Sequence, residues 1–148
     1  MGEDKIVLDT SVLIAGIIGS KASKGILIRI LNGELIAVIS DSIFKEYLKA
    51  IQFDRVSDRI DVSRTYLVLD KLYRVSLKVT PKEKFKLCRD PGDDEFLNVA
   101  YEAKANCIIT LDKDLLDLGN EAKKLKLKEH VIKILRPEEF LEELNKRV

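Results

Sequence analysis

The chain alternates short apolar runs with longer amphipathic segments, and this alternation restricts it to one class of fold. Strands that are joined through helices favour a mainly parallel sheet covered by helices on both faces. We therefore expect an α/β protein, a three-layer α/β/α sandwich forming a single domain over residues 1–148. The expected strands are 5–9, 34–40, 75–79, 106–110 and 130–135; the expected helices are 23–33, 40–51, 59–74, one from Asp93 or Asp94 to about Lys104, and 137–147.

Two segments are assigned from their apolar and charged patterns alone. Within residues 59–74, helical spacing predicts that Leu67, Val68, Leu72 and Tyr73 face the core. The lysine-rich stretch "KKLKLK", residues 123–128, is interpreted as a solvated helix face. Capping chemistry indicates that Ser40 or Asp41 begins the helix after the second strand.

Charge and composition exclude several classes of function. The chain carries 26 Lys and Arg against 25 Asp and Glu, so any attraction for nucleic acid must be local. No apolar run approaches the length of a membrane span, and no signal segment opens the chain, so we expect a cytoplasmic protein without a membrane partner. Cys88, Cys107 and His130 do not have the spacing of a zinc site.

One acid, Asp9, stands inside the apolar run "IVLDTSVL", where an ionised carboxylate requires a partner. In open α/β sheets the functional crevice lies outside the carboxyl ends of the strands. Further acids follow other expected strands or begin the helix that leads into one. Those acids are Asp41, Glu46, Asp93, Asp94, Asp112 and Asp114.

Each of these further acids also has a simpler structural interpretation. Asp41, Asp93 and Asp94 could cap helices, because carboxylates favour helix N-termini, and Asp114 could be a solvated surface charge. Asp93 is preferred to Asp94 because apolar residues follow it at i+3, i+4 and i+7, on the same helical face. The corresponding positions after Asp94 include polar residues, so Asp94 is expected to point away from the core.

Several carboxylates that converge without His or Cys indicate a hard cation with oxygen ligands, Mg²⁺ or Mn²⁺. Such a cation removes the mutual repulsion of the acids, lowers the pKa of bound water and stabilises charge on a phosphoryl oxygen. Metal-assisted hydrolysis of a phosphodiester therefore fits a site made of acids alone.

The motifs "VLDTSVLIAG", "FKEYL", "RDPGDDEFLNVA" and "IITLDKDLL", in this order, resemble those of the PIN-domain ribonucleases, and most closely the VapC-like toxins of toxin–antitoxin pairs. The likeness runs from Lys5 to about Leu141. It implies a small α/β/α fold and a metal-dependent endoribonuclease that uses Mg²⁺ or Mn²⁺ and acts on RNA. It also implies a cognate antitoxin protein and a homodimer or higher homo-oligomer.

Carried over motif by motif, the resemblance assigns the catalytic acids Asp9, Glu46, Asp93 and Asp112, with Asp9, Asp93 and Asp112 as metal ligands. Asp94 and Asp114 are lesser candidates, and Thr10 or Ser11 and Thr110 would orient the acids through hydrogen bonds. Ser11 stands where the family commonly has Asn after Asp-Thr.

Two other classes of function are weighed against the nuclease. A PIN-like module could bind RNA or a protein without cutting, although the intact acids argue against it. A phosphatase or phosphoacceptor domain also places an Asp after its first strand, but the accompanying acids and lysine are not where those chemistries need them. An RNA substrate would require a basic surround, for which the candidates are Lys21, Lys24, Arg29, Lys45, Lys49, Arg55, Arg59 and the lysines of 123–128.

Overall fold

A six-stranded sheet forms the centre of the protein in the computed structural model, which describes residues 4–147. The strand order is β3-β2-β1-β4-β6-β5, and every neighbouring pair is parallel except the antiparallel pair β5 and β6. The expected mainly parallel sheet is confirmed. The strands are β1 (Lys5–Leu8), β2 (Ile36–Ile39), β3 (Leu77–Lys78), β4 (Cys107–Ile109), β5 (Lys124–Leu127) and β6 (His130–Leu135).

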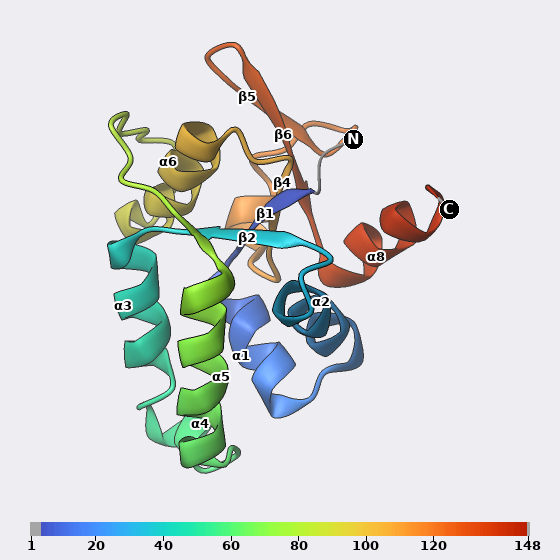
Figure 1. The fold of residues 1–148 in the computed structure, drawn as a ribbon. Coiled ribbons are helices and arrows are strands. Elements are labelled where there is room, and N and C mark those ends of the chain that lie inside the picture. Colours follow the sequence, from blue (N-terminus) through green and yellow to red (C-terminus); the bar gives the residue numbers. More distant parts are fainter. Residues whose placement is uncertain (1–3, 148) are drawn as a thin grey trace.

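Helices cover both faces of this sheet, as the α/β/α expectation requires. Figure 1 shows α6 on one side of the sheet and α2, α5 and α8 on the other. A short 3₁₀ turn, η1 (Pro91–Asp93), leads into α6. The helices are α1 (Thr10–Ile18), α2 (Lys21–Leu31), α3 (Asp41–Ala50), α4 (Asp54–Ser57), α5 (Val62–Val75), α6 (Asp94–Ala103), α7 (Lys113–Leu116) and α8 (Pro137–Asn145).

The central strand β1 is buried because both of its faces are covered. Ile6, Val7 and Leu8 expose 0%, 0% and 2% of their surface. A strand buried on both faces has a continuous apolar sequence rather than an alternating one, and "IVL" has that pattern. The next residue, Asp9, therefore lies at the carboxyl end of a buried central strand.

Three sequence interpretations are corrected by the structure. The lysine-rich stretch is the edge strand β5, paired with β6 in a hairpin, and not a helix face. Leu67 is 71% exposed, whereas Leu69 and Leu72 of the same helix are 1% exposed, so the inward face of α5 includes Leu69 and excludes Leu67. A helix that was not expected, α1, directly follows Asp9 and ends at Gly19, whose φ of +116° suits glycine.

Within residues 4–147, no single helix is long and apolar enough to cross a membrane. Helices α1 and α2 reach that length and apolar composition only together, and they are bent by 99° relative to one another.

Candidate active site

The acids gather where the order of the strands reverses. From β1 the chain continues to β2 and β3 on one side, then crosses through α6 to β4 on the other side of β1. The carboxyl ends of β1 and β4 are therefore neighbours at a switch point, where open α/β sheets place their functional crevice. The backbone N–H of Asp9 donates to the carbonyl oxygen of Ile109 over 3.0 Å, which fixes the two strand ends together.

Asp9 is buried, with 6% of its surface exposed, at the position before α1. Its carboxylate does not cap that helix. Instead, Oδ2 accepts hydrogen bonds from the hydroxyls of Thr110 at 2.6 Å and Ser11 at 2.9 Å. Both hydroxyls donate to the same oxygen and hold the carboxylate in one orientation, while Oδ1 is left for another partner.

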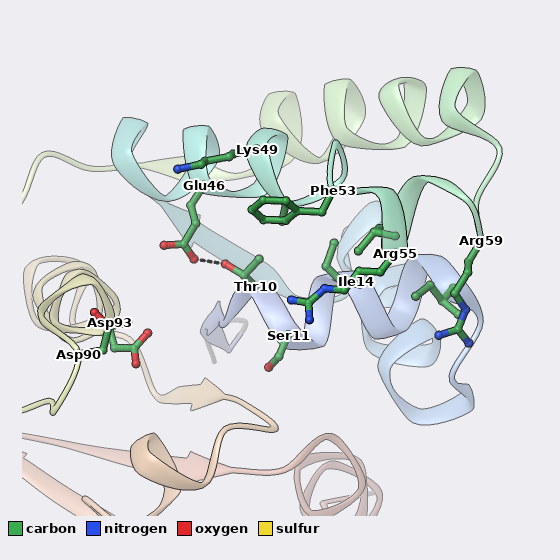
Figure 2. A pocket seen from close by; sticks show the side chains of 13 residues that line it. Thr10, Ser11, Ile14, Glu46, Lys49, Phe53, Arg55, Arg59, Asp90 and Asp93 are labelled. Atoms are coloured by element: carbon green, nitrogen blue, oxygen red, sulfur yellow. Dashed lines mark hydrogen bonds between the residues drawn. The ribbon is translucent and has the colours of Figure 1, made fainter.

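Glu46 approaches the same place from α3. The hydroxyl of Ser40 caps this helix by accepting from the N–H of Ile43 at 3.1 Å, which settles the choice between Ser40 and Asp41. The hydroxyl of Thr10 donates to the carboxylate of Glu46 (Figure 2). Thr10 and Ser11 thus serve different acids, Glu46 and Asp9 respectively.

Tyr47, next to Glu46, joins α3 to the first strand. Its hydroxyl donates to the carbonyl oxygen of Leu8 over 2.6 Å, beside Asp9. Burial raises the pKa of this hydroxyl, and the negative charges of Asp9 and Glu46 raise it further. Tyr47 therefore stays protonated and acts as a fixed tether between α3 and the end of β1.

Asp93 is half-buried at the start of α6 and shows most clearly that negative charge accumulates here. Burial, followed by the carboxylates of Asp9, Asp112, Asp90 and Glu46, raises the pKa of the Asp93 carboxyl from 3.8 to about 7. These acids come from four different parts of the chain, and the fold brings them within electrostatic reach of Asp93. Asp90 was not singled out from the sequence, although it stands in the same "RDPGDD" motif.

Asp94 does not point to solvent as the helical-face argument predicted, since only 8% of its surface is exposed. Its Oδ1 accepts hydrogen bonds from the backbone N–H groups of Leu87 at 3.0 Å and Cys88 at 2.8 Å. Asn98 and Glu102 follow at i+4 and i+8 and accept the N–H groups of Phe85 at 2.8 Å and Lys82 at 3.1 Å. This face of α6 thus holds the irregular segment 79–90 in place, and Asp94 has a structural use.

Asp112 begins α7, just beyond the end of β4. Its Oδ1 accepts from the backbone N–H of Asp114 at 3.0 Å, and its own N–H donates to the hydroxyl of Thr110 at 2.9 Å. Thr110 therefore connects Asp112 to Asp9. Asp114 is exposed, donates to Asp112 through its backbone N–H, and is not among the charges that raise the pKa of Asp93.

An open cleft of about 750 Å³ extends from these acids along α1, α3 and α4. One end is acidic, with Glu46, Asp90 and Asp93 (Figure 2). The remainder has an apolar floor and carries three cations and an exposed phenylalanine. The cations are Lys49, Arg55 and Arg59, and the phenylalanine is Phe53.

Other basic candidates lie elsewhere. Lys21 and Arg29 line a separate hollow between α2 and α8, and Lys24 lines another beside α5. Of the basic candidates, Lys49, Arg55 and Arg59 are those that line the cleft of Glu46 and Asp93. Phe53 was not predicted as a site residue, since one aromatic residue in a polar stretch has no periodic signal.

The donor chemistry of the cluster suits a hard cation. Within residues 4–147, no three His, Cys, Asp or Glu side chains lie close enough to form a ready-made metal cage. Mg²⁺ does not need such a cage, because it keeps several waters and is commonly held by one or two carboxylates. The uncompensated charge that raises the pKa of Asp93 is a charge that such an ion would neutralise.

Comparison with known proteins gives three findings. The profile of the PIN domain matches residues 5–114. An uncharacterized protein of Methanocaldococcus jannaschii, MJ1680, is 38% identical over 148 residues, which cover 96% of this chain and 92% of that protein. The crystal structure of PAE2754 from Pyrobaculum aerophilum superposes with a TM-score of 0.62 and 15% identity, covering 97% of this chain and 90% of that one.

The fold and the site together define the class of protein: it is an α/β/α sandwich with an acid-lined crevice at the switch point of its sheet. The match over residues 5–114 and the relative from M. jannaschii then identify the family. The chain belongs to the PIN-domain family, whose function is of the nuclease type and generally uses divalent metal ions.

Proposed function

We propose that this protein is an endoribonuclease that depends on Mg²⁺ or Mn²⁺ and that it is the toxin component of a toxin–antitoxin pair. The observation that supports the nuclease most directly is the convergence of five carboxylates, which raises the pKa of Asp93 to about 7. A site of this kind attracts a divalent cation, and the cation in turn attracts a phosphodiester.

Asp9, Asp93 and Asp112 are the residues that would hold the ion, directly or through water. When bound, the ion lowers the pKa of a water molecule and stabilises negative charge on the phosphoryl oxygens. The chain supplies orientation: Thr110 and Ser11 fix the carboxylate of Asp9. Thr10 donates to the carboxylate of Glu46, which would position the attacking water through its second oxygen.

The basic part of the cleft supports RNA as the substrate. Lys49, Arg55 and Arg59 are exposed, and none of them makes a salt bridge within residues 4–147. Their charges are available for phosphate groups on either side of the cleaved bond. The cleft therefore combines an end that binds a cation with an end that binds polyanions.

The partners belong to the same proposal. An antitoxin encoded beside this protein would inhibit it by placing an Arg among the acids, because a guanidinium pairs well with carboxylates. A homodimer or higher homo-oligomer is expected as well. Co-expression with the adjacent open reading frame, followed by size-exclusion chromatography with light scattering, tests both: a lone monomer with no stable complex would contradict them.

The test of the nuclease is cleavage of a labelled single-stranded RNA of mixed sequence with Mg²⁺ or Mn²⁺, with EDTA, and with Asp9→Asn. We expect cleavage only with the metal, and a loss of at least about 100-fold in Asp9→Asn with the fold retained by circular dichroism, since the metal does most of the activation. The exposed Asp117→Asn serves as the matched control. Cleavage in EDTA, or full activity in Asp9→Asn, would contradict the mechanism.

The alternative is a PIN-like module that binds RNA or protein without cutting. It would account for the lack of a ready-made metal cage in the described residues 4–147, although Mg²⁺ binding does not require one. Calorimetric titration with Mn²⁺ separates the two functions: the nuclease binds the ion and loses that binding in Asp9→Asn, whereas the non-cleaving module binds it weakly in both forms.

A further inference from the structure

Phe53 is an exposed aromatic side chain inside the cleft. It precedes α4, and 49% of its surface is exposed. Figure 2 shows its ring directed into the cleft, on the side of Glu46 and Thr10. About half of this apolar side chain is thus open to a ligand in the cleft, and covering it would remove apolar surface from water.

Three cations share the cleft with this ring. Lys49 stands four residues before Phe53, on α3, and Arg55 and Arg59 follow on α4 and just beyond it; all three line the same cleft. An aromatic face next to unpaired guanidinium groups is the combination that proteins use for single-stranded nucleic acid, with bases stacked on the ring and phosphates on the cations. A lipid or an apolar peptide would not need the cations.

We infer that Phe53 is a stacking platform for one base of the substrate RNA, and that Arg55 and Arg59 contact the phosphates flanking that base. This inference rests on the proposed ribonuclease function and adds to it a residue that positions the strand. A base within a duplex has both faces covered by its neighbours, so the segment bound here must contain an unstacked base.

The spacing along the chain limits where that base lies. Glu46 and Phe53 line the same cleft, Glu46 on α3 and Phe53 in the turn after that helix ends at Ala50. The steps from Glu46 to Ala50 advance by about 6 Å at the helical rise, and the turn residues up to Phe53 add at most about 10 Å. At about 3.4 Å per nucleotide of a stacked strand, the base that stacks on Phe53 lies within about five nucleotides of the cleaved bond.

The test measures binding of a fluorescent 12-nucleotide single-stranded RNA by anisotropy, in the Asp9→Asn background with Mg²⁺ so that the strand stays intact. Adding Phe53→Ala should weaken binding by at least about fivefold, the lower end of the loss for one stacked base, while Phe53→Tyr should retain it. Binding of the fully paired duplex should change less than about twofold. Tyr66→Ala is the matched control, because Tyr66 is an aromatic residue that is 43% exposed on α5, outside the cleft.

A scan with one abasic site at a time distinguishes stacking from general contact. With Phe53 present, an abasic site at one position of the RNA should weaken binding by about fivefold or more. In Phe53→Ala, the same abasic site should weaken binding no further. Equal losses at all positions, or an effect no larger than that of Tyr66→Ala, would overturn the inference. RNA cleavage is measured separately with the unmodified protein. If that protein cleaves RNA but Phe53→Ala leaves RNA binding unchanged, the stacking inference is refuted while the proposed nuclease function is retained.

Discussion

Replacing Asp93 by Asn should stabilise the folded protein, but only at pH values where the carboxyl of Asp93 would be ionised. Burial and the neighbouring carboxylates raise the pKa of this group from 3.8 to about 7 in the folded state. Between these two pH values the folded protein binds a proton at Asp93 that the unfolded chain does not bind. The free energy of unfolding therefore falls as the pH rises through this window, and the loss is complete above pH 7.

The size of the effect follows from the shift after allowance for solvent. A shift from 3.8 to about 7 corresponds to about 4 kcal/mol if it is taken in full. Asp93 is only half-buried, so water and salt screen much of the repulsion that it experiences. We expect Asp93→Asn to raise the free energy of unfolding by about 1 kcal/mol above pH 7 and by almost nothing near pH 4.

Urea denaturation at pH 4, 5.5, 7 and 8.5, with EDTA present, measures this difference. Asp117→Asn is the control, because Asp117 is exposed and is not among the charges that act on Asp93. Adding Mg²⁺ at pH 8 should stabilise the unmodified protein and stabilise Asp93→Asn less, since the variant has lost one of the proposed ligands and much of the repulsion. A variant that is less stable than the parent at pH 8.5, or equally shifted at every pH, would refute the account of Asp93 as a crowded acid.

Two further predictions concern the scaffold. Asp94→Ala should lower the free energy of unfolding by about 2–3 kcal/mol, because two backbone N–H groups of segment 79–90 lose their acceptor. Thermal denaturation measures this loss, and a value under about 0.5 kcal/mol would contradict the structural role of Asp94. Leu69→Ala should lower the free energy of unfolding by about 2–5 kcal/mol, and Leu67→Ala by less than about 0.5 kcal/mol, because Leu69 is buried and Leu67 is exposed. Parallel urea titrations measure both, and similar losses in the two variants would show that Leu67 also packs on the inner face of α5.

The repeating pattern of the sequence was enough to predict the central sheet and most helices. The buried strands are short apolar runs, and helices α2, α3 and α6 carry apolar residues at the helical period. The hairpin β5–β6 was missed because its two-residue turn is Lys128-Glu129, not an Asn-Gly or Asp-Gly pair. Lys128 adopts a φ of +54°, which is uncommon for lysine. The alternation of Lys and Leu in β5 did not stand out in a chain of which 34% is charged residues.

The burial of Asp94 could not be predicted from periodicity because its partner has no periodicity. Segment 79–90 is irregular. The N–H of Val79 still donates to the carbonyl oxygen of Ile39 in β2 over 2.9 Å, but beyond Val79 the segment leaves the sheet, and the N–H groups of Lys82, Phe85, Leu87 and Cys88 need other acceptors. Asp94, Asn98 and Glu102 accept those N–H groups instead and so replace the ladder that a strand would have provided. On a helix diagram these residues are indistinguishable from a solvated polar face, and only the course of the neighbouring segment gives them a different environment.

The candidate acids posed a different problem, because a helix N-terminus at the end of a parallel strand suits a capping residue and a metal ligand equally well. In the structure, capping occupies at most one oxygen of these carboxylates. Asp112 gives one oxygen to the N–H of Asp114, and Asp9 occupies the position before α1 without capping it. The N-terminus of α1 and the hydroxyls of Ser11 and Thr110 stabilise the negative charge of Asp9, so this acid tolerates burial while its Oδ1 remains available. Local sequence rules describe Asp9, Asp93 and Asp112 correctly as residues at helix starts, and the order of the strands then determines that these helix starts meet.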